Sequence, residues 1–410
     1  MTGYVLAFGL ALLLAVLTSG LASRSPLSTT TVFLAAGLVA GPLGLDILHA
    51  SRGTVAQISE VALFSILFVD GQDAPLSVLR NNWRLSARAL FIGMPLTLVL
   101  IAGAAHWIVG LPWLAALVLG AVLAPTDPVF ASSLVGRNDV PRNVRHLLNI
   151  ESGVNDGLAL PAVLLLIGLA GGRSIGQSTE LLPLLLELAG GVALGVALPV
   201  LIWLLLRLPH VGATSRLRAL GPFSIAVVLF GLCHLTDANP FLAAFVAGSV
   251  ISTLQHDASE AFRHTGELAS EMVKGAALLA FATLLGPGTF AHAGVMGFVF
   301  AIVVLVVTRP APVLAVLART SLSARQRLSV AWFGPKGFAS VVYAAMVAFS
   351  DMDAADEVLA LAAVTVLVSA AAHSSTDLFV AKRLSAEQQR LDPDSPALDV
   401  EAAEIAAADR

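Results

Sequence analysis

The dominant pattern in this sequence is a series of long apolar segments separated by short polar ones. An apolar segment of about 17 to 25 residues is long enough to cross a bilayer as a helix. The pattern predicts thirteen such helices, over residues 3–22, 29–48, 54–70, 86–108, 112–136, 144–171, 180–206, 217–236, 239–254, 266–286, 291–318, 326–349 and 355–380. The chain is therefore expected to be an all-α integral membrane protein.

The arginines between these segments indicate how the chain crosses the membrane. Cytoplasmic loops of membrane proteins are enriched in Lys and Arg. If the N-terminus lies outside, fourteen loop arginines are cytoplasmic, and only Arg52 and Arg173 are external. A miscounted helix would destroy this asymmetry. We therefore expect thirteen spans, with the N-terminus outside and the C-terminus in the cytoplasm.

Composition supports a membrane protein. Hydrophobic residues make up 57% of the chain and charged residues only 12%, whereas a soluble domain carries about a quarter charged residues. The net charge of −4 gives no sign of a nucleic-acid partner, and a single cysteine, Cys233, excludes a disulfide framework. Segment 3–22 lacks a basic region before it and is expected to be retained. Residues 381–410 are polar and are expected to form a short cytoplasmic tail, disordered or a frayed helix.

Two of the apolar segments are interrupted near their middle. Segment 112–136 contains Ala124-Pro125-Thr126-Asp127-Pro128, and segment 326–349 contains Gly334-Pro335-Lys336-Gly337. Proline breaks the helical hydrogen-bond ladder, and freed backbone groups are tolerated at membrane depth only next to protein or a wet cavity. Broken helices in corresponding positions of two halves point to an inverted repeat with a binding site at its interface. Asp127 could alternatively do no more than cap the second half-helix.

Segment 144–171 adds a cluster of polar side chains to this region. Glu151, Ser152, Asn155 and Asp156 lie within two helical turns, with Ser152 and Asp156 on one face. An ionisable group at bilayer depth costs about 2.5–3.5 kcal/mol and needs a partner or a role. Carboxylate and hydroxyl oxygens suit an alkali cation. The sequence thus predicts a cation site that also carries a proton.

Structural ion pairs are the alternative interpretation of these charges. Glu151 is best explained by a pair with Arg309, which lies in segment 291–318. Asp156 could be paired in the same way. Glu60 and Asp70 could line a funnel to the site, although a solvated turn is the favoured interpretation for Asp70 and Asp73. A helix-face network of charges is predicted for three residues one turn apart, namely Glu267, Glu271 and Lys274.

The order of these motifs resembles a known family. Thr126-Asp127-Pro128, followed by Glu151-Ser152, two further residues and Asn155-Asp156-Gly157, is similar to the NhaP-type sodium/proton antiporters of the monovalent cation:proton antiporter-1 family. The resemblance covers nearly the whole membrane region, 1–380. It implies a NhaA-like fold with inverted repeats and two broken, crossing helices. It also implies a core domain that includes 86–171 and 291–380, a dimerisation domain from the remainder, and a homodimer.

The resemblance also implies roles for individual residues. Asp156 matches the aspartate that binds the ion and carries the proton, with Asp127, Thr126 and Ser152 as supporting ligands for Na⁺. Asn155 stands where electrogenic relatives have a second aspartate, which implies electroneutral exchange. Glu151 and Arg309 match the structural ion pair of the family. One departure is Lys336, where the family commonly has arginine, because a lysine can lose its proton when buried.

The implied function is exchange of Na⁺ or Li⁺ for H⁺ by alternating access in a bacterial inner membrane, with a role in pH homeostasis. Potassium/proton exchange is the alternative, because oxygen ligands alone do not fix the ionic radius. A cation channel is disfavoured, because channels use rings of carbonyls or charges around a symmetric pore. No phosphate loop, nucleophile elbow or zinc spacing occurs in the sequence, so neither an enzyme nor a cofactor is expected.

Overall fold

The computed structural model describes residues 2–22, 29–74, 88–127, 155, 159–171, 181–209, 212, 214, 217–318, 320 and 322–391. All regular secondary structure in these residues is helical, as the apolar pattern predicts. Five helical segments among them are long and apolar enough to cross a membrane: Gly53–Asp73, Ala89–Val109, Leu185–Leu205, Pro287–Leu317 and Ala355–Thr376. Shorter apolar helices correspond to most of the other predicted spans.

The first three helices are α1 (Thr2–Ala22), α2 (Thr29–Ala40) and α3 (Arg52–Asp73). Helix α2 ends at Ala40 and not at residue 48, because Gly41 precedes Pro42 and a residue before proline is disfavoured in the α region. Helix α3 begins where the Ser51 hydroxyl accepts a hydrogen bond from the Thr54 N–H, a regular N-cap.

The fourth predicted span is a continuous rod that contains two π-helical turns. It consists of η1 (Ala89–Gly93), α6 (Met94–Ala104) and η2 (Ala105–Val109). Helix α7 (Trp113–Leu123) follows after a left-handed Gly110, and residues 159–170 are again helical. π-Helical turns are rare and occur often near functional sites.

Four helices then form the middle of the chain: α10 (Leu181–Leu205), α11 (Leu220–Leu235), α12 (Pro240–Leu254) and α13 (His256–Ala282). Helix α13 begins at His256, whereas the apolar pattern predicts its start at residue 266. The additional residues are polar, so they carry no membrane signal, yet Asp257 in the first turn favours a helix start through the helix dipole.

The last part of the chain contains α14 (Pro287–Val303), the π-turn η4 (Val304–Thr308), α15 (Pro310–Leu317), α16 (Ala324–Trp332), α17 (Phe338–Ala348) and α18 (Ala355–Leu391). Helix α18 continues to Leu391, so the segment from 381 onward begins as helix and not as a disordered tail. Leu384 is 2% exposed and packs in a small cluster with Leu317 and Phe333. This burial explains why the polar end of α18 stays helical.

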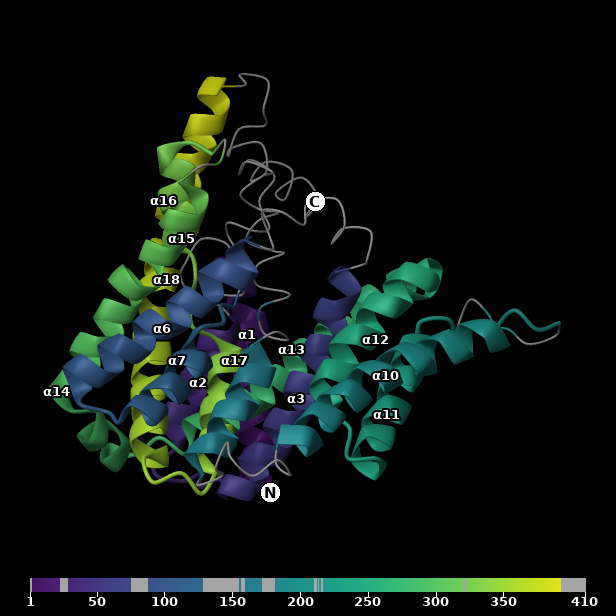
Figure 1. Ribbon diagram of the computed structural model, residues 1–410, viewed down its shortest axis with the longest axis horizontal. Coiled ribbons are helices and arrows are strands. Elements are labelled where there is room, and N and C mark those ends of the chain that lie inside the picture. Colours follow the sequence, from purple (N-terminus) through teal and green to yellow (C-terminus); the bar gives the residue numbers. More distant parts are fainter. Residues whose placement is uncertain are drawn as a thin grey trace.

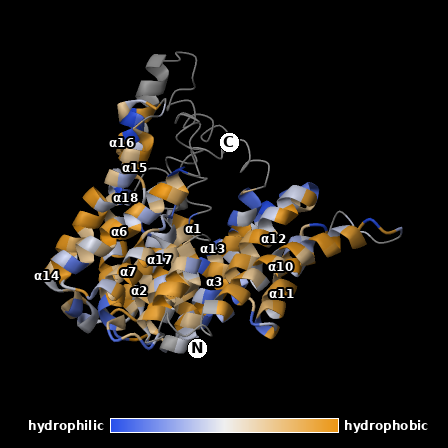
Figure 2. Cartoon of the chain, in the orientation of Figure 1, coloured by the Kyte–Doolittle hydropathy of each residue, from blue (hydrophilic) through white to orange (hydrophobic). Residues whose placement is uncertain are grey.

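The helices form two groups that lie side by side (Figure 1). Helix α12 packs on α3 and α10 in one group, whereas α14 and α17 pack on α18 in the other. Helices α13 and α17 lie near the centre, and both contact α3. The outer surfaces of both groups are mainly apolar (Figure 2), with Trp107 76% and Leu235 82% exposed. Such surfaces suit a lipid environment, and the protein is a multi-pass membrane protein.

Glycine allows α3 and α12 to approach closely. A Cβ at Gly248 would overlap the Phe68 carbonyl of α3, and one at Gly71 would overlap the Phe245 carbonyl of α12. Small residues at such contacts strengthen van der Waals packing between membrane helices. This pair of helices therefore forms a rigid wall beside the centre of the molecule.

Candidate functional site

The two predicted interruptions are both present, and they meet. Helix α7 ends at Leu123, and residues 124–127 are not helical. Helix α16 ends at Trp332, and α17 starts only at Phe338 after the non-helical residues 333–337. The Asp127 N–H donates a hydrogen bond to the Pro335 carbonyl over 2.9 Å. The two breaks thus satisfy each other's free backbone groups at the crossing point.

The carboxylate of Asp127 caps the half-helix on the other side of the crossing. Its Oδ2 accepts a hydrogen bond from the Phe338 N–H over 2.9 Å, and the residue is 5% exposed. Phe338 is the first residue of α17, so the negative charge lies at the positive end of the helix dipole. Gly337 makes this possible, because any side chain there would overlap Asp127.

Lys336 supplies the opposite charge to the end of α7. Its Nζ donates to the Pro125 carbonyl over 3.3 Å and to the Ala124 carbonyl over 3.5 Å. These carbonyls lack helical partners because α7 has ended. The backbone N–H of Lys336 donates to the Ser369 hydroxyl of α18 over 2.8 Å. The side chain is 1% exposed, so the crossing contains a buried cation held by backbone dipoles.

Ser369 belongs to a short polar chain that anchors the second break to α18. Its hydroxyl lies 3.1 Å from His373 Nδ1, and His373 Nε2 lies 2.9 Å from the Trp332 carbonyl at the end of α16. His373 Nδ1 also lies 2.8 Å from the Ser369 carbonyl, so a neutral imidazole donates either to Ser369 from Nδ1 or to Trp332 from Nε2, according to its tautomer. Ser369 and His373 were not predicted as site residues, because both lie in an apolar span without a recognisable motif.

Thr126 and Asn155 form a second contact at the first break. Asn155 Nδ2 donates to the Thr126 hydroxyl over 2.7 Å, and both residues are at most 3% exposed. Among the described residues, the buried side-chain amide oxygen of Asn155 has no hydrogen-bond donor. It borders a cavity of about 20 Å³ between α6, α15 and the end of α7, which is large enough for one water molecule.

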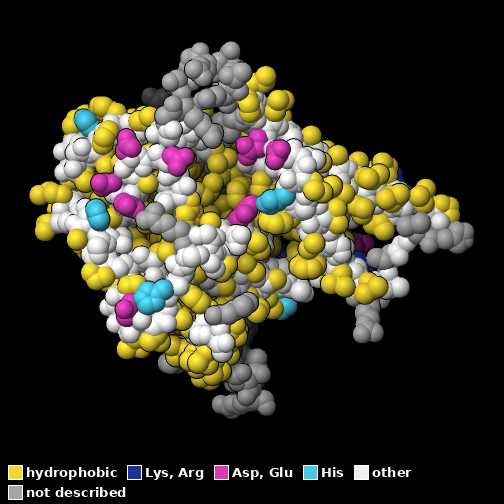
Figure 3. Space-filling view, turned by 90° about the horizontal axis from the view of Figure 1, so that it is seen from below, with side chains coloured by type: hydrophobic (Ala, Val, Ile, Leu, Met, Phe, Trp, Pro, Cys, Tyr) yellow, Lys and Arg dark blue, Asp and Glu magenta, His cyan; other side chains and the backbone are white. Residues whose placement is uncertain are grey.

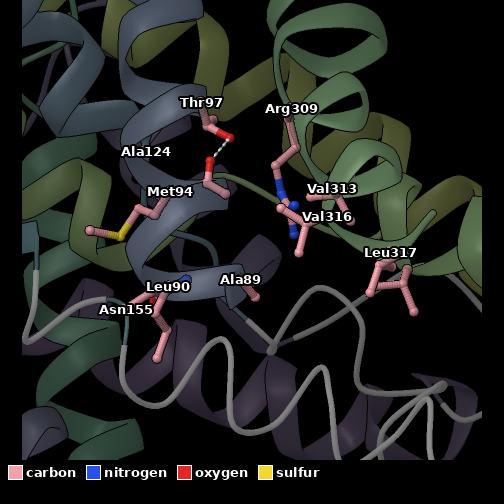
Figure 4. A pocket seen from close by; sticks show the side chains of 12 residues that line it. Ala89, Leu90, Met94, Thr97, Ala124, Asn155, Arg309, Val313, Val316 and Leu317 are labelled. Atoms are coloured by element: carbon pink, nitrogen blue, oxygen red, sulfur yellow. Dashed lines mark hydrogen bonds between the residues drawn. The ribbon is translucent and has the colours of Figure 1, made fainter. Parts of the chain in front are cut away.

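Arg309 enters the same small cavity from the other side (Figure 4). It follows the π-turn η4 and is 3% exposed. A Cβ at Gly334 would overlap its guanidinium group, so the second break packs directly on Arg309. Its predicted partner Glu151, and the predicted ion ligands Ser152 and Asp156, lie outside the described residues. Their roles stay predictions.

A larger cavity of about 220 Å³ borders Asp127 from the side of α3 and α13. The ionisable groups that line it are Asp70 and Asp73 of α3, Glu267, Glu271 and Lys274 of α13, and Asp127. Asp70 thus lies where a funnel residue would lie. Glu60 does not line this cavity: its carboxylate lies 3.0 Å from His234 Nε2 of α11.

Lys274 connects α13 to the crossing, a contact that the sequence pattern does not predict. Of the predicted helix-face network, the pair of Lys274 Nζ and Glu271 Oε1 is present at 3.6 Å, whereas Glu267 lies 3.8 Å from Arg263 instead. The same Nζ also lies 3.8 Å from Asp127 Oδ2, and both side chains are less than a tenth exposed. The sequence does contain a hint of this contact, because Lys274 stands at the start of the apolar half of α13, where a lysine needs a buried partner.

Comparison with known proteins finds similar sequences along most of the chain. The sequence model described as "Sodium/hydrogen exchanger, transmembrane" matches residues 9–381. The chain is 26% identical over 364 residues to the K(+)/H(+) antiporter NhaP2 of Shewanella sp. (strain MR-4), covering 86% of this chain and 62% of that protein. It is 24% identical over 344 residues to the K(+)/H(+) antiporter NhaP of Alkalimonas amylolytica, covering 83% and 59%. The chain therefore spans about three fifths of the length of these relatives.

The fold is similar to that of a solved protein. The structure of the sodium proton antiporter MjNhaP1 from Methanocaldococcus jannaschii at pH 8 superposes with a TM-score of 0.77 at 20% identity, covering 94% of this chain and 99% of that one. This likeness confirms the predicted fold class.

Proposed function

Because the chain belongs to the sodium/hydrogen exchanger family, we propose that it exchanges a monovalent cation for protons across a membrane. The membership confirms the resemblance drawn from the two sequence motifs. One observation carries the proposal: the buried carboxylate of Asp127 lies at the crossing of two broken helices and borders an acidic cavity. A carboxylate placed there can be reached by cations and protons alike.

Competition for the same oxygen atoms is the proposed mechanism. A proton and a cation cannot both occupy one carboxylate, so binding of one releases the other. Asp127 and Asp156 are the proposed carriers, with oxygens of Thr126 and Ser152 as additional ligands. These are hard oxygen ligands of the kind that alkali cations take. Asn155 contributes an amide and no second charge at its position, which supports one-for-one, electroneutral exchange.

Sodium or lithium is the proposed substrate, as the motif resemblance implies. Potassium is the second candidate, because relatives that align along most of the chain are named K(+)/H(+) antiporters. The ligands described above are oxygen atoms, which bind both ions.

Alternating access requires two parts that move relative to one another. The proposed moving core includes 86–171 and 291–380, which contain both broken helices. The remainder, with α3, α12 and α13, is the proposed scaffold and dimerisation domain of a homodimer. The close glycine packing of α3 on α12 supports a rigid scaffold.

The proposed location is a bacterial inner membrane, with the N-terminus outside. The face in Figure 3 carries acidic and histidine side chains and few lysines or arginines. Arg88 and Arg327 lie together at the C-terminal end of α15, where Arg88 donates to the Val316 carbonyl and Arg327 to the Ala318 carbonyl. We propose that this end faces the cytoplasm, because the cytoplasmic ends of membrane proteins are enriched in Lys and Arg.

Proteoliposomes with an internal pH dye test the proposal. Addition of Na⁺ or Li⁺ outside should change the internal pH, and the response should persist when valinomycin clamps the voltage with K⁺. Asp127→Asn should abolish the response, whereas Glu260→Gln, on the exposed surface of α13, should retain it. A response to K⁺ alone would change the substrate, and no response to any of the three cations would refute the proposal.

A further inference from the structure

Lys274 and Asp127 come from parts of the chain that the proposed function assigns to different bodies. Asp127 lies in the first broken helix of the core, and Lys274 lies in α13 of the scaffold. The ammonium nitrogen is 3.8 Å from Asp127 Oδ2, the same oxygen that caps α17. A cation from the scaffold thus faces a carboxylate that the transported cation is proposed to use.

The surroundings of this pair differ from those of a purely structural ion pair. A structural pair is normally enclosed, because water weakens it and apolar packing strengthens it. Here both residues border the 220 Å³ cavity together with Asp70, Asp73, Glu267 and Glu271. Five carboxylates face one lysine in this cavity. A small cation that enters it therefore meets a strongly negative site in which one positive charge is already present.

Lys274 also lies close to a second carboxylate. Glu271 Oε1 lies 3.6 Å from its Nζ, and the Glu271 side chain is 42% exposed. Glu271 is thus the outer neighbour of the ammonium group and Asp127 the inner one. The lysine side chain is long and flexible, with rotatable bonds that move its charge without moving the helix. The ammonium group lies between the two carboxylates, and a small displacement toward Glu271 would withdraw it from Asp127.

We propose that Lys274 competes with the transported cation for the carboxylate of Asp127. When the site is empty, its ammonium group pairs with Asp127, and when a cation binds, the ammonium group moves toward Glu271. This inference rests on the proposed function, because it assumes that Asp127 binds the substrate. It assigns to Lys274 a role in setting cation affinity. Lys274 is then a positioning residue and takes no part in the chemistry.

Equilibrium binding on the purified full-length protein tests this role without transport. Radiolabelled sodium is the probe, or radiolabelled rubidium if the exchange assay shows a response to potassium only. Measurements are made at alkaline pH, so that protons compete least. Lys274→Gln should lower the half-saturating cation concentration roughly tenfold, because it removes a positive charge next to the binding carboxylate. Lys274→Arg keeps the charge and should stay within about threefold of the wild type.

Three further variants separate competition from a general charge effect. Arg207→Gln removes one positive charge from the exposed turn that follows α10, away from the residues that line the cavity, and should leave the half-saturating concentration unchanged. Glu271→Gln removes the outer neighbour and confines Lys274 to Asp127, so it should raise the half-saturating concentration more than Glu267→Gln, which removes a carboxylate of the same cavity that pairs with Arg263. If Lys274→Gln does not elute as a folded protein in size-exclusion chromatography, the Glu271→Gln variant alone tests the inference.

The possible outcomes separate this inference from the proposed function. Opposite shifts in Lys274→Gln and Glu271→Gln would support it. An unchanged or higher half-saturating concentration in Lys274→Gln, with only the maximal exchange rate reduced, would show a structural role and overturn it. If the wild type binds and exchanges no cation at all, the proposed function fails, and this inference fails with it.

Discussion

The backbone of Gly337 lies against the side chain of Asp127 so closely that no side chain fits between them. A Cβ at residue 337 would overlap both the Cβ and the carboxylate of Asp127. The contact joins the second broken helix to the first exactly where Asp127 accepts the Phe338 N–H. The glycine is thus needed for space and not for an unusual backbone angle.

We therefore expect Gly337→Ala to displace Asp127 from the cap of α17. Overpacking of a close contact costs typically about 1–3 kcal/mol, and here it also moves the proposed ligand. Cation-driven proton flux should fall by at least about tenfold, the factor that corresponds to the lower part of this range. Gly288→Ala is the matched control, because nothing lies within 4 Å of a Cβ at Gly288. Normal flux in Gly337→Ala would contradict the tight crossing.

A second prediction concerns the charge of Lys336. Lys336→Met would leave the Ala124 and Pro125 carbonyls without their donor, and each buried unsatisfied group costs about 1–3 kcal/mol. The variant should unfold at a lower temperature in a fluorescence-monitored melt and lose exchange. Lys336→Arg retains the charge and should retain exchange.

The pH profile of Lys336→Arg shows whether Lys336 titrates. Arginine keeps its proton at any accessible pH. A profile that matches the wild type would mean that the lysine remains charged throughout the cycle. If the exchange rate of Lys336→Arg no longer falls at either low or high pH, as it does in the wild type, the proton of Lys336 takes part in transport.

A third prediction concerns the anchor of the second break on α18. Ser369→Ala removes the acceptor of the buried Lys336 N–H, which should cost about 1–3 kcal/mol of stability. Ser375→Ala is a suitable control, because Ser375 is exposed on the same helix and its hydroxyl donates to the Ala371 carbonyl one turn earlier. Thermal melts of both variants in detergent measure the difference, and equal melting temperatures would argue against the anchor.

A fourth prediction concerns the wall formed by α3 and α12. Gly248→Val would force the two backbones apart, because even a Cβ overlaps the Phe68 carbonyl. We expect loss of thermal stability and a lower yield of folded protein. Gly231→Val, in α11, has open space around its Cβ and should behave like the wild type. The elution profile in size-exclusion chromatography distinguishes the two variants.

The sequence predicts the broken helices well, because their cause is local. Pro125 and Pro335 each remove a helical hydrogen bond, and each stands close to a charged residue in an apolar span, so both interruptions can be predicted from neighbouring residues. Their meeting point follows only from the resemblance to a family. The hydrogen bond between Asp127 and Pro335 joins segments more than two hundred residues apart, and no local pattern encodes such a contact.

Contacts between helices that are far apart in the sequence explain why the site in the structure differs from the predicted one. Lys274 has a local partner, Glu271, which the spacing predicts, but its contact with Asp127 depends on how α13 packs beside α17 and α3. Glu60 lies in an apolar span like the site residues, yet it faces His234. The polar start of α13 lies outside the predicted span because hydropathy detects membrane spans and not helices, whereas the helical end of α18 is one of the two forms expected for the tail.

The π-turns of this chain determine in which direction the later side chains point. A π-turn places one extra residue in a helical turn, which rotates everything after it by about 100°, the angle of one residue in an α-helix. Arg309 directly follows such a turn at Val304–Thr308. Deletion of a single residue there would restore a regular helix but rotate Arg309, Val313 and Val316 away from the small cavity. The π-turn at Val304–Thr308 thus sets the direction in which the side chains of α15 point. For this reason the helix should tolerate insertions and deletions poorly, which composition alone does not reveal.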